Sequence, residues 1–236
     1  MRIQISYPLS SKSPLYPGTL PPEFHHLKSM ERGDNSDTTA ITVSSHSGSH
    51  LDVPRHFCPD GKTVKEIIPS NIRIAPVYCI TINKTSGTPL QGSDIEPFIT
   101  PCKDAAGIFI RTGMYSVRDI DSDRYCSRHP WVHPEVPSFL REHCPEIQIF
   151  GTDTISISSP AHREEGRECH RRFLCGRKPI LLVEDMDLSN PNLSTEPLAI
   201  TIYPWIVDEL DGVPVLAFAE SFHRHYNNAS AGERKS

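Results

Sequence analysis

Three histidines and one aspartate fall within eleven consecutive residues of this chain. They are His46, His50, Asp52 and His56, in the run His-Ser-Gly-Ser-His-Leu-Asp-Val-Pro-Arg-His. Imidazole nitrogens together with a carboxylate oxygen are a typical ligand set for zinc and other first-row divalent metals. A bound metal with an open coordination position lowers the pKa of water to ~7 and so supplies hydroxide at neutral pH. The run therefore predicts a metal site that could be catalytic.

The backbone around these residues must be extended and turned, because a glycine, a proline and several serines make a continuous helix implausible. In extended backbone alternate side chains lie on one face, so His50 and Asp52 project together. The Ser-Gly-Ser turn brings His46 to the same point. The alternative is a polar loop with surface or hydrogen-bonded histidines, and four candidate ligands bracketed by glycine and proline favour the metal site.

The elements that must position this site are short. β-Branched and aromatic runs that end at turn residues predict strands. Two of these runs, at residues 108–110 and 180–183, are continuously apolar, as expected of central strands covered on both faces. Helical signals occur at residues 135–143 and 164–174. The predicted strands span residues 40–44, 74–82, 107–111, 147–150, 180–184, 198–202 and 215–218.

Composition excludes several classes of partner. The chain has 24 basic and 29 acidic residues and a net charge of −5, so it has no field that would draw it onto nucleic acid or an anionic membrane. It contains no run of roughly 18 to 20 apolar residues, and the N-terminus lacks the apolar stretch of a signal peptide. We therefore expect a cytoplasmic protein without a nucleic-acid or membrane partner.

The ends of the chain differ from its middle. Residues 1–39 are rich in proline, serine and glycine, which predicts an extended, irregular segment draped over the body. Residues 226–236 have no apolar face and are expected to be frayed. We find no internal repeat and no linker, so residues 1–225 are expected to form one domain.

Seven cysteines, an odd number without a Cys-x-x-Cys pair, argue against a disulfide framework and a zinc ribbon. We expect most of them to be reduced and buried. Cys58 follows the histidine run and has an alternative interpretation as a nucleophile, although free cysteine usually packs as a small buried hydrophobe.

The spacing His-x-Gly-Ser-His-x-Asp-x-Pro-x-His closely resembles the signature of the putative cyclase family, which includes bacterial kynurenine formamidases and isatin hydrolases. Only Ser49 differs, because the family signature has threonine there. The resemblance implies that His46, His50 and Asp52 bind metal. It also implies that His56 is the general acid and base.

Family members carry a further histidine and glutamate downstream. By resemblance these are His170, on a predicted helix, and Glu184, at the end of a central strand. His162 and Glu165 remain rivals for the two positions. The implied cofactor is zinc or manganese, with one or two ions per chain and Asp52 able to bridge them.

The resemblance extends over most of the chain. Residues 5–18 are similar to the family's N-terminal segment, in which an aromatic residue before Pro-Gly lies against the substrate. Tyr16 is therefore a candidate substrate-binding residue, where the formamidases have tryptophan, and Phe57 is a second candidate. Residues 110–113, 150–154 and 211–215 resemble further family segments.

The implied fold is a compact, single α/β domain of the swivelling β/β/α type, with a mixed β-sheet or barrel-like core and a few flanking helices. Family members form homodimers or homotetramers and act on small molecules. The same resemblance implies a metal-dependent hydrolase that cleaves an amide, a cyclic amide or a lactone. Two alternatives stay open: a biosynthetic cyclase or dehydratase with the same metal centre, and a non-catalytic metal- or ligand-binding protein. The presence of His56 speaks against the latter, which has no use for a proton shuttle.

Overall fold

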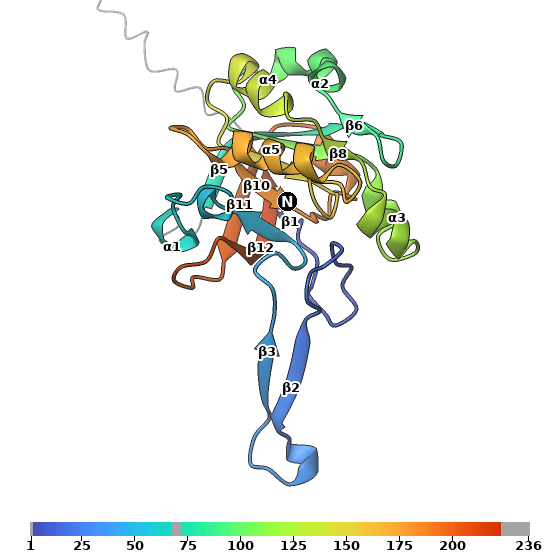
Figure 1. The fold of residues 1–236 in the computed structure, drawn as a ribbon, viewed down its shortest axis with the longest axis vertical. Coiled ribbons are helices and arrows are strands. Elements are labelled where there is room, and N and C mark those ends of the chain that lie inside the picture. The colour runs from blue at the N-terminus through green and yellow to red at the C-terminus, as the bar shows by residue number, and fades with distance from the viewer. Residues whose placement is uncertain (1, 68–71, 223–236) are drawn as a thin grey trace, which may run out of the picture.

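A closed, mixed β-sheet forms the body of the computed structural model, which describes residues 2–67 and 72–222 (Figure 1). Within this part the main sheet has eight strands in the order β1-β12-β11-β5-β7-β9-β10-β4. β12 also pairs with β4, so the seven strands from β12 to β4 close into a ring. The strands are β1 Arg2–Gln4, β4 His50–Asp52, β5 Ile72–Thr81, β7 Gly107–Arg111, β9 Ile149–Thr152, β10 Leu181–Glu184, β11 Leu198–Pro204 and β12 Gly212–Ser221.

Side chains alternate between the inside and the outside of this ring. In β7, Phe109 belongs to the core that all seven ring strands enclose, whereas Ile108 and Ile110 belong to a second core under the helices. The second core also contains apolar side chains of α2 Gly92–Ile99, α4 Val136–His143 and α5 Arg163–Leu174, which lie together over one side of the sheet (Figure 1). Burial on both faces explains why the central strands read as continuous apolar runs.

The remaining elements are short. Helices α1 Val64–Ile67 and α3 Ser122–Ser127 flank the sheet, and β6 Pro89–Leu90 pairs with β8 Trp131–Val132 in parallel. Within residues 2–67 and 72–222, no helix is long and apolar enough to cross a membrane. Single 3-10 turns occur at Met30–Arg32, Pro54–His56, Thr100–Cys102, Met114–Ser116 and Pro191–Ser194.

A two-stranded ribbon, which we call the arm, projects away from the body (Figure 1). It consists of β2 Glu23–Lys28 and β3 Thr38–Thr42, which pair in antiparallel fashion with Phe24 opposite Ile41. Every residue of β2 is exposed. The prediction of an irregular segment draped over the body is therefore wrong for this stretch, because the β-branched strand β3 offers an edge that β2 joins.

The seven predicted strands and both predicted helices are present, with their ends shifted by at most a few residues. Helix α2 was not predicted, because Gly92 and Pro97 obscure its pattern. Its start is nevertheless marked by a capping box between Gln91 and Asp94. The tail predicted to be frayed, residues 226–236, lies outside the described residues.

One cysteine pair departs from expectation. Cys58 and Cys175 form a disulfide, which contradicts the prediction for Cys58. Because 117 residues separate the two cysteines, sequence spacing could not reveal the pair. The other cysteines are free and buried, as predicted: Cys79, Cys102, Cys126, Cys144 and Cys169.

Candidate active site

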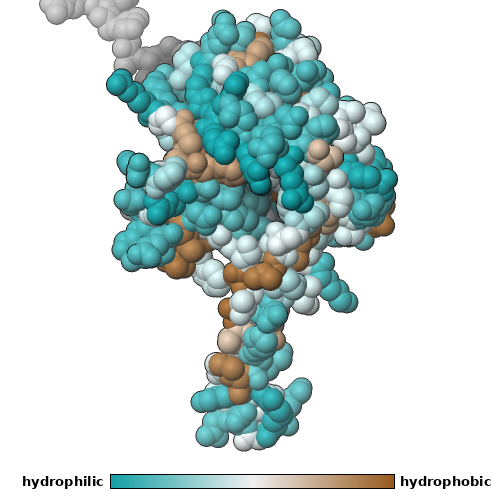
Figure 2. Space-filling view, in the orientation of Figure 1, coloured by the Kyte–Doolittle hydropathy of each residue, from teal (hydrophilic) through white to brown (hydrophobic). Residues whose placement is uncertain are grey.

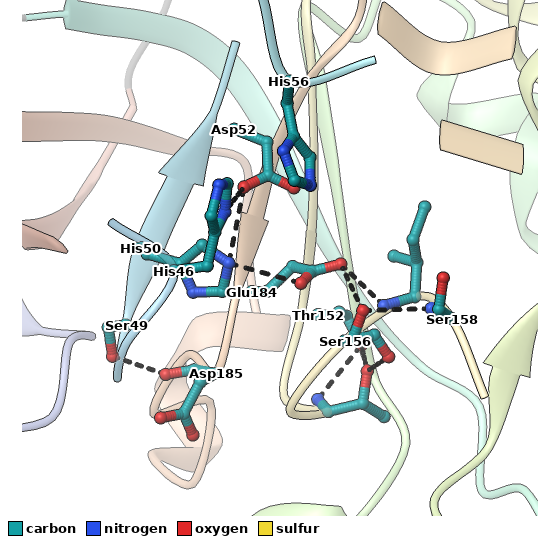
Figure 3. A network of polar contacts seen from close by, with 12 residues as sticks. His46, Ser49, His50, Asp52, His56, Thr152, Ser156, Ser158, Glu184 and Asp185 are labelled. Carbon is teal, nitrogen blue, oxygen red and sulfur yellow. Dashed lines mark hydrogen bonds and ion pairs between the residues drawn. The ribbon is translucent and has the colours of Figure 1, made fainter. Parts of the chain in front are cut away.

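Two neighbouring strands of the ring place three of the predicted ligands side by side. β4 and β10 pair in antiparallel fashion with Glu184 opposite His50. Leu51 and Val183 point into the enclosed core, so alternation turns His50, Asp52 and Glu184 to the outer face. These three side chains are buried there, with only 1 to 3% of their surface exposed, and Figure 3 shows them converging.

Helix α5 covers this face and contributes the fourth ligand candidate. His170 is buried, and its Nε2 lies 3.7 Å from Asp52 Oδ2 and 3.6 Å from Glu184 Oε1. The helix approaches closely because Gly166, one turn earlier, has no side chain; a Cβ there would overlap Ser158. The helix and strand meet as the sequence predicted.

The buried histidines are oriented through their second ring nitrogen. His50 Nδ1 is 2.8 Å from the carbonyl of Gly48, and His170 Nδ1 is 2.8 Å from the carbonyl of Gly166. When Nδ1–H donates to these carbonyls, the lone pair of each Nε2 faces the carboxylates. This arrangement is usual for histidines that bind metal.

The two carboxylates are held differently. Glu184 Oε1 accepts hydrogen bonds from the Ile157 amide at 2.6 Å and the Ser156 hydroxyl at 3.2 Å, which directs Oε2 toward His50. Asp52 Oδ1 lies 2.8 Å from His46 Nδ1. Its Oδ2 is buried and has no hydrogen-bond partner among the described residues. A buried carboxylate oxygen without a partner is costly unless a ligand satisfies it.

The spacing of the donor atoms fits a divalent metal. His50 Nε2 is 3.4 Å from both Asp52 Oδ1 and Glu184 Oε2. That separation is long for a hydrogen bond, but tetrahedral ligands at ~2.1 Å from one ion lie roughly 3.4 Å apart. His46, Asp52 and His56 form a second group of possible ligands, so Asp52 belongs to both groups.

Charge balance keeps these buried groups ionised. Burial alone would raise the pKa of Glu184, but hydrogen bonds and the charges of His170 and His50 hold that pKa well below its usual value. Burial lowers the pKa of His46, yet Asp52 and Asp211 outweigh it and raise that pKa to about 10. The carboxylates are therefore ready to act as ligands, while a metal must displace protons from the imidazoles.

Asp211 is a site residue that the sequence did not reveal. It precedes β12, and its Oδ2 lies 3.0 Å from His56 Nδ1 and 2.9 Å from His46 Nε2. Its other oxygen accepts a hydrogen bond from the Ser45 hydroxyl at 3.0 Å. Asp211 lies 155 positions beyond His56 in the chain, so spacing in the sequence gives no sign that the two residues meet. Gly212 is also required, since a Cβ there would lie 2.5 Å from the His46 ring.

The cluster lies at the floor of a cleft of about 690 Å³. Tyr16 and Phe57, the predicted substrate-binding residues, both line it. The Phe57 ring stacks on His170 with 4.6 Å between ring centroids. In Figure 2 the surface is hollowed between α5 and the root of the arm.

The rival ligands lie elsewhere. His162 stacks on Trp131 with 4.6 Å between ring centroids, and its Nδ1 is 3.9 Å from Glu165. Neither His162 nor Glu165 is among the described residues that line the cleft. The structure thus brings together His46, His50, Asp52, His56, His170 and Glu184 and leaves the rivals outside.

The chain folds as an α/β protein with a closed mixed sheet. The outer face of this sheet carries a buried cluster of histidines and carboxylates that could hold a metal ion. The family model described as "Putative cyclase" matches residues 3–159, more than half of the chain. The chain belongs to this family, as its histidine signature predicted.

Similar proteins span nearly the whole chain. A kynurenine formamidase from Bacillus cereus is 24% identical over 215 residues, covering 91% of this chain and 95% of that protein. One from Geobacillus thermodenitrificans is 26% identical over 224 residues, with the same coverage. Isatin hydrolase A from Ralstonia solanacearum has a TM-score of 0.73 at 16% identity, covering 93% of this chain and 91% of that one. Isatin hydrolase A from Labrenzia aggregata has a TM-score of 0.70 at 19% identity, covering 93% of each chain. The predicted fold class is confirmed.

Proposed function

We propose that this protein is a metal-dependent hydrolase that cleaves an amide, in the manner of a kynurenine formamidase, or a cyclic amide or lactone. The observation that carries the proposal is the buried cluster of His50, Asp52 and Glu184 on a cleft, in which Asp52 Oδ2 has no hydrogen-bond partner among the described residues. The names of the similar proteins support the same reaction class.

We assign His46, His50, Asp52, His170 and Glu184 as ligands of one or two divalent ions, zinc or manganese. Imidazole nitrogens with carboxylate oxygens suit either metal. His170 and Glu184 lie beyond the residues matched by the family model, so their assignment rests on geometry. When bound, the metal supplies Lewis-acid polarisation of the carbonyl and a water of lowered pKa.

His56 is the proposed proton carrier. Asp211 accepts the hydrogen bond from Nδ1–H, which leaves Nε2 free to take a proton and pass it to the leaving group. Phe57 and Tyr16 line the cleft and would pack against an aryl group and exclude water from it. The products of amide cleavage are a carboxylic acid and an amine.

The test is hydrolysis by the purified protein, stripped of metal and then reloaded with zinc or manganese. We expect hydrolysis of N-formylkynurenine that disappears with a chelator and returns with metal, and at least about one equivalent of bound metal. Isatin and simple lactones are the comparison substrates. If the fully metal-loaded protein hydrolyses none of the three substrates, the hydrolase assignment is contradicted. The cyclase, dehydratase or non-catalytic alternatives would then be favoured.

We further propose that the protein forms a homodimer or homotetramer and that the arm contacts a second copy. A two-stranded ribbon is marginally stable alone, and this one exposes 38% of Phe24, 63% of Leu27 and 48% of Ile41. Sedimentation should give a multiple of the 26.5 kDa chain mass, reduced when Phe24 and Leu27 are replaced by serine. A wild-type monomer would contradict the proposal.

We propose a cytoplasmic location, which agrees with five free buried cysteines. The Cys58–Cys175 disulfide makes this testable, because disulfides persist mainly in oxidising compartments. In a reducing cytoplasm the Cys58–Cys175 bond of the structure would be open, so alkylation of intact cells before lysis should label both thiols. Full protection of both cysteines would place the protein outside the cytoplasm.

A further inference from the structure

We propose that Arg163 and Arg167 bind an anionic group of the substrate, a carboxylate, on the wall of the cleft. The inference rests on the proposed hydrolase function and adds a substrate class to it: amides whose far end carries a negative charge. Both arginines belong to α5 and both line the cleft.

The helical repeat points these arginines the same way as a ligand candidate. Arg163, Arg167 and His170 stand at positions i, i+4 and i+7 of α5, which share one face of a helix. His170 faces the buried carboxylates, so this face looks into the cleft. At 1.5 Å per residue, the Cα atoms of Arg167 and Arg163 lie roughly 5 and 10 Å along the axis from that of His170. A substrate with its scissile carbonyl at the cluster could therefore place a carboxylate, several bonds away, beside these arginines.

The described lining of the cleft offers no exposed acidic residue to these arginines. The only acidic residues among the described lining are Asp52 and Glu184, and both are buried in the histidine cluster. The guanidinium group of Arg163 has no ion pair or hydrogen bond within residues 2–67 and 72–222. Arg167 pairs with Glu164 at 2.5 Å, but that glutamate is 79% exposed, and exposed pairs contribute little.

Two further arginines of α5 lie outside the cleft. Arg171 and Arg172 do not line the cleft, and both pair with Glu168, at 3.9 and 2.7 Å. Of these four arginines, Arg163 has no carboxylate partner among the described residues, and it lines the cleft together with Arg167. A guanidinium presents N–H donors in a fork that matches a carboxylate and offers nothing to a cation.

Tyr16 completes a set of donors. Tyr16 lines the same cleft as Arg163 and Arg167, and burial, the largest influence, raises the pKa of its phenol. Because the net shift is upward, the phenol stays protonated and can donate a hydrogen bond. Two guanidinium groups and a phenol O–H suit an anion.

The test compares two ligands that differ only in charge. We would titrate 3-(4-aminophenyl)propanoate and its neutral primary amide into metal-loaded protein by calorimetry. The acid should bind about 10-fold more tightly than the amide, and the preference should shrink as salt rises. In the R163Q/R167Q variant the preference should disappear. The matched control R171Q/R172Q removes the same charge from residues of α5 that do not line the cleft, and it should keep the preference for the acid.

Several outcomes would overturn the inference. No detectable binding of the acid would show that the cleft has no site for it. A preference for the acid that survives in R163Q/R167Q would place the carboxylate elsewhere, for example on the metal. An equal loss of the preference in R171Q/R172Q would show that the preference depends on net charge and not on the two arginines of the cleft. Circular dichroism of the variants checks their fold, and because both arginines are exposed we expect it unchanged.

The corresponding formamides separate this inference from the proposed function. Equal kcat/KM for 3-(4-formamidophenyl)propanoate and its neutral amide would overturn the anion site and leave the hydrolase assignment intact. A binding preference for the acid that depends on Arg163 and Arg167, without hydrolysis of either formamide, would uphold the anion site and contradict the hydrolase assignment.

Discussion

At the scale of single residues, the candidate centre depends on which group orients each imidazole by accepting a hydrogen bond from its Nδ1–H. Backbone carbonyls orient His50 and His170, so their direction is set by the main chain. His56 instead relies on one carboxylate, that of Asp211, which it shares with His46. The difference separates residues that should govern metal binding from residues that should govern proton transfer.

Replacing Asp52 and replacing His56 should therefore have different effects. Asp52→Ala should abolish both bound metal and activity, because this carboxylate belongs to both ligand groups. His56→Ala should lower kcat by a factor on the order of 10² or more while metal content stays near wild type. Metal analysis measures the bound metal of each variant, and steady-state kinetics measures its kcat. Full metal occupancy in Asp52→Ala, or metal loss in His56→Ala that matches the loss of activity, would contradict the assigned roles.

Asp211→Asn should act on kcat through His56. The neutral amide replaces the charged acceptor of Nδ1–H, so the imidazole loses its fixed orientation. We expect kcat to fall about 10- to 100-fold, with a smaller change in KM. Ser45→Ala, which removes a different contact of Asp211, is the control and should have a weaker effect. An unchanged kcat in Asp211→Asn would show that His56 is oriented by something else.

At the scale of elements, three segments far apart in sequence must meet: β4, β10 and α5. The strands are joined by their ladder. The helix is packed on the outer core through Phe173 and Leu174. The Cys58–Cys175 disulfide then ties the loop after β4 to the end of α5. The position of His170 therefore depends on how closely α5 approaches the sheet.

Gly166→Ala tests this close approach. In an open helix alanine is favoured over glycine by about 1 kcal/mol. Here the added methyl would overlap Ser158, so we expect destabilisation of about 1 to 3 kcal/mol instead. Displacement of α5 should also weaken metal binding through His170. Urea denaturation and metal titration measure the two effects. A stabilised variant with wild-type metal affinity would refute the close contact.

At the scale of the whole molecule, ring closure decides where the site lies. Because β12 pairs with β4, the sheet has a filled interior, and the polar side chains of β4 and β10 can only lie outside, beneath α5. The buried charges of this region tie the stability of the fold to pH and to metal.

The metal-free protein should lose stability between about pH 6.5 and 10. Asp52 and Asp211 raise the pKa of His46 from 6.5 to about 10 against the effect of burial. A raised pKa means that the folded state holds the proton more tightly, so this contribution is complete below pH 6.5 and is lost as pH rises through 10. In the metal-loaded protein His46 is already deprotonated, and the dependence should be absent.

Urea midpoints at several pH values, with and without zinc, measure this effect. His46→Gln is the control and should weaken the pH dependence of the metal-free protein, leaving the part that comes from His50 and His170, whose pKa values are also raised. Parallel pH profiles for the metal-free and metal-loaded forms would contradict the assignment of His46 as a ligand.

Local sequence was sufficient for several features of this protein. The spacing of His46, His50, Asp52 and His56 identified the family, and β-branched runs located the strands, because both signals depend on residues a few positions apart. His170 and Glu184 were proposed from the resemblance of their surroundings to family segments, and the structure brings both beside Asp52.

Only the tertiary structure revealed Asp211 behind His56, the disulfide between Cys58 and Cys175, and the arginines of α5 facing the cleft. Each depends on which segments are brought together when the sheet closes and the helix packs on it. Partners more than a hundred residues apart leave no spacing pattern in a single sequence. Neighbouring residues in the sequence were therefore enough to predict a metal site, whereas the packing of distant segments decided how its side chains are oriented and which residues line the cleft.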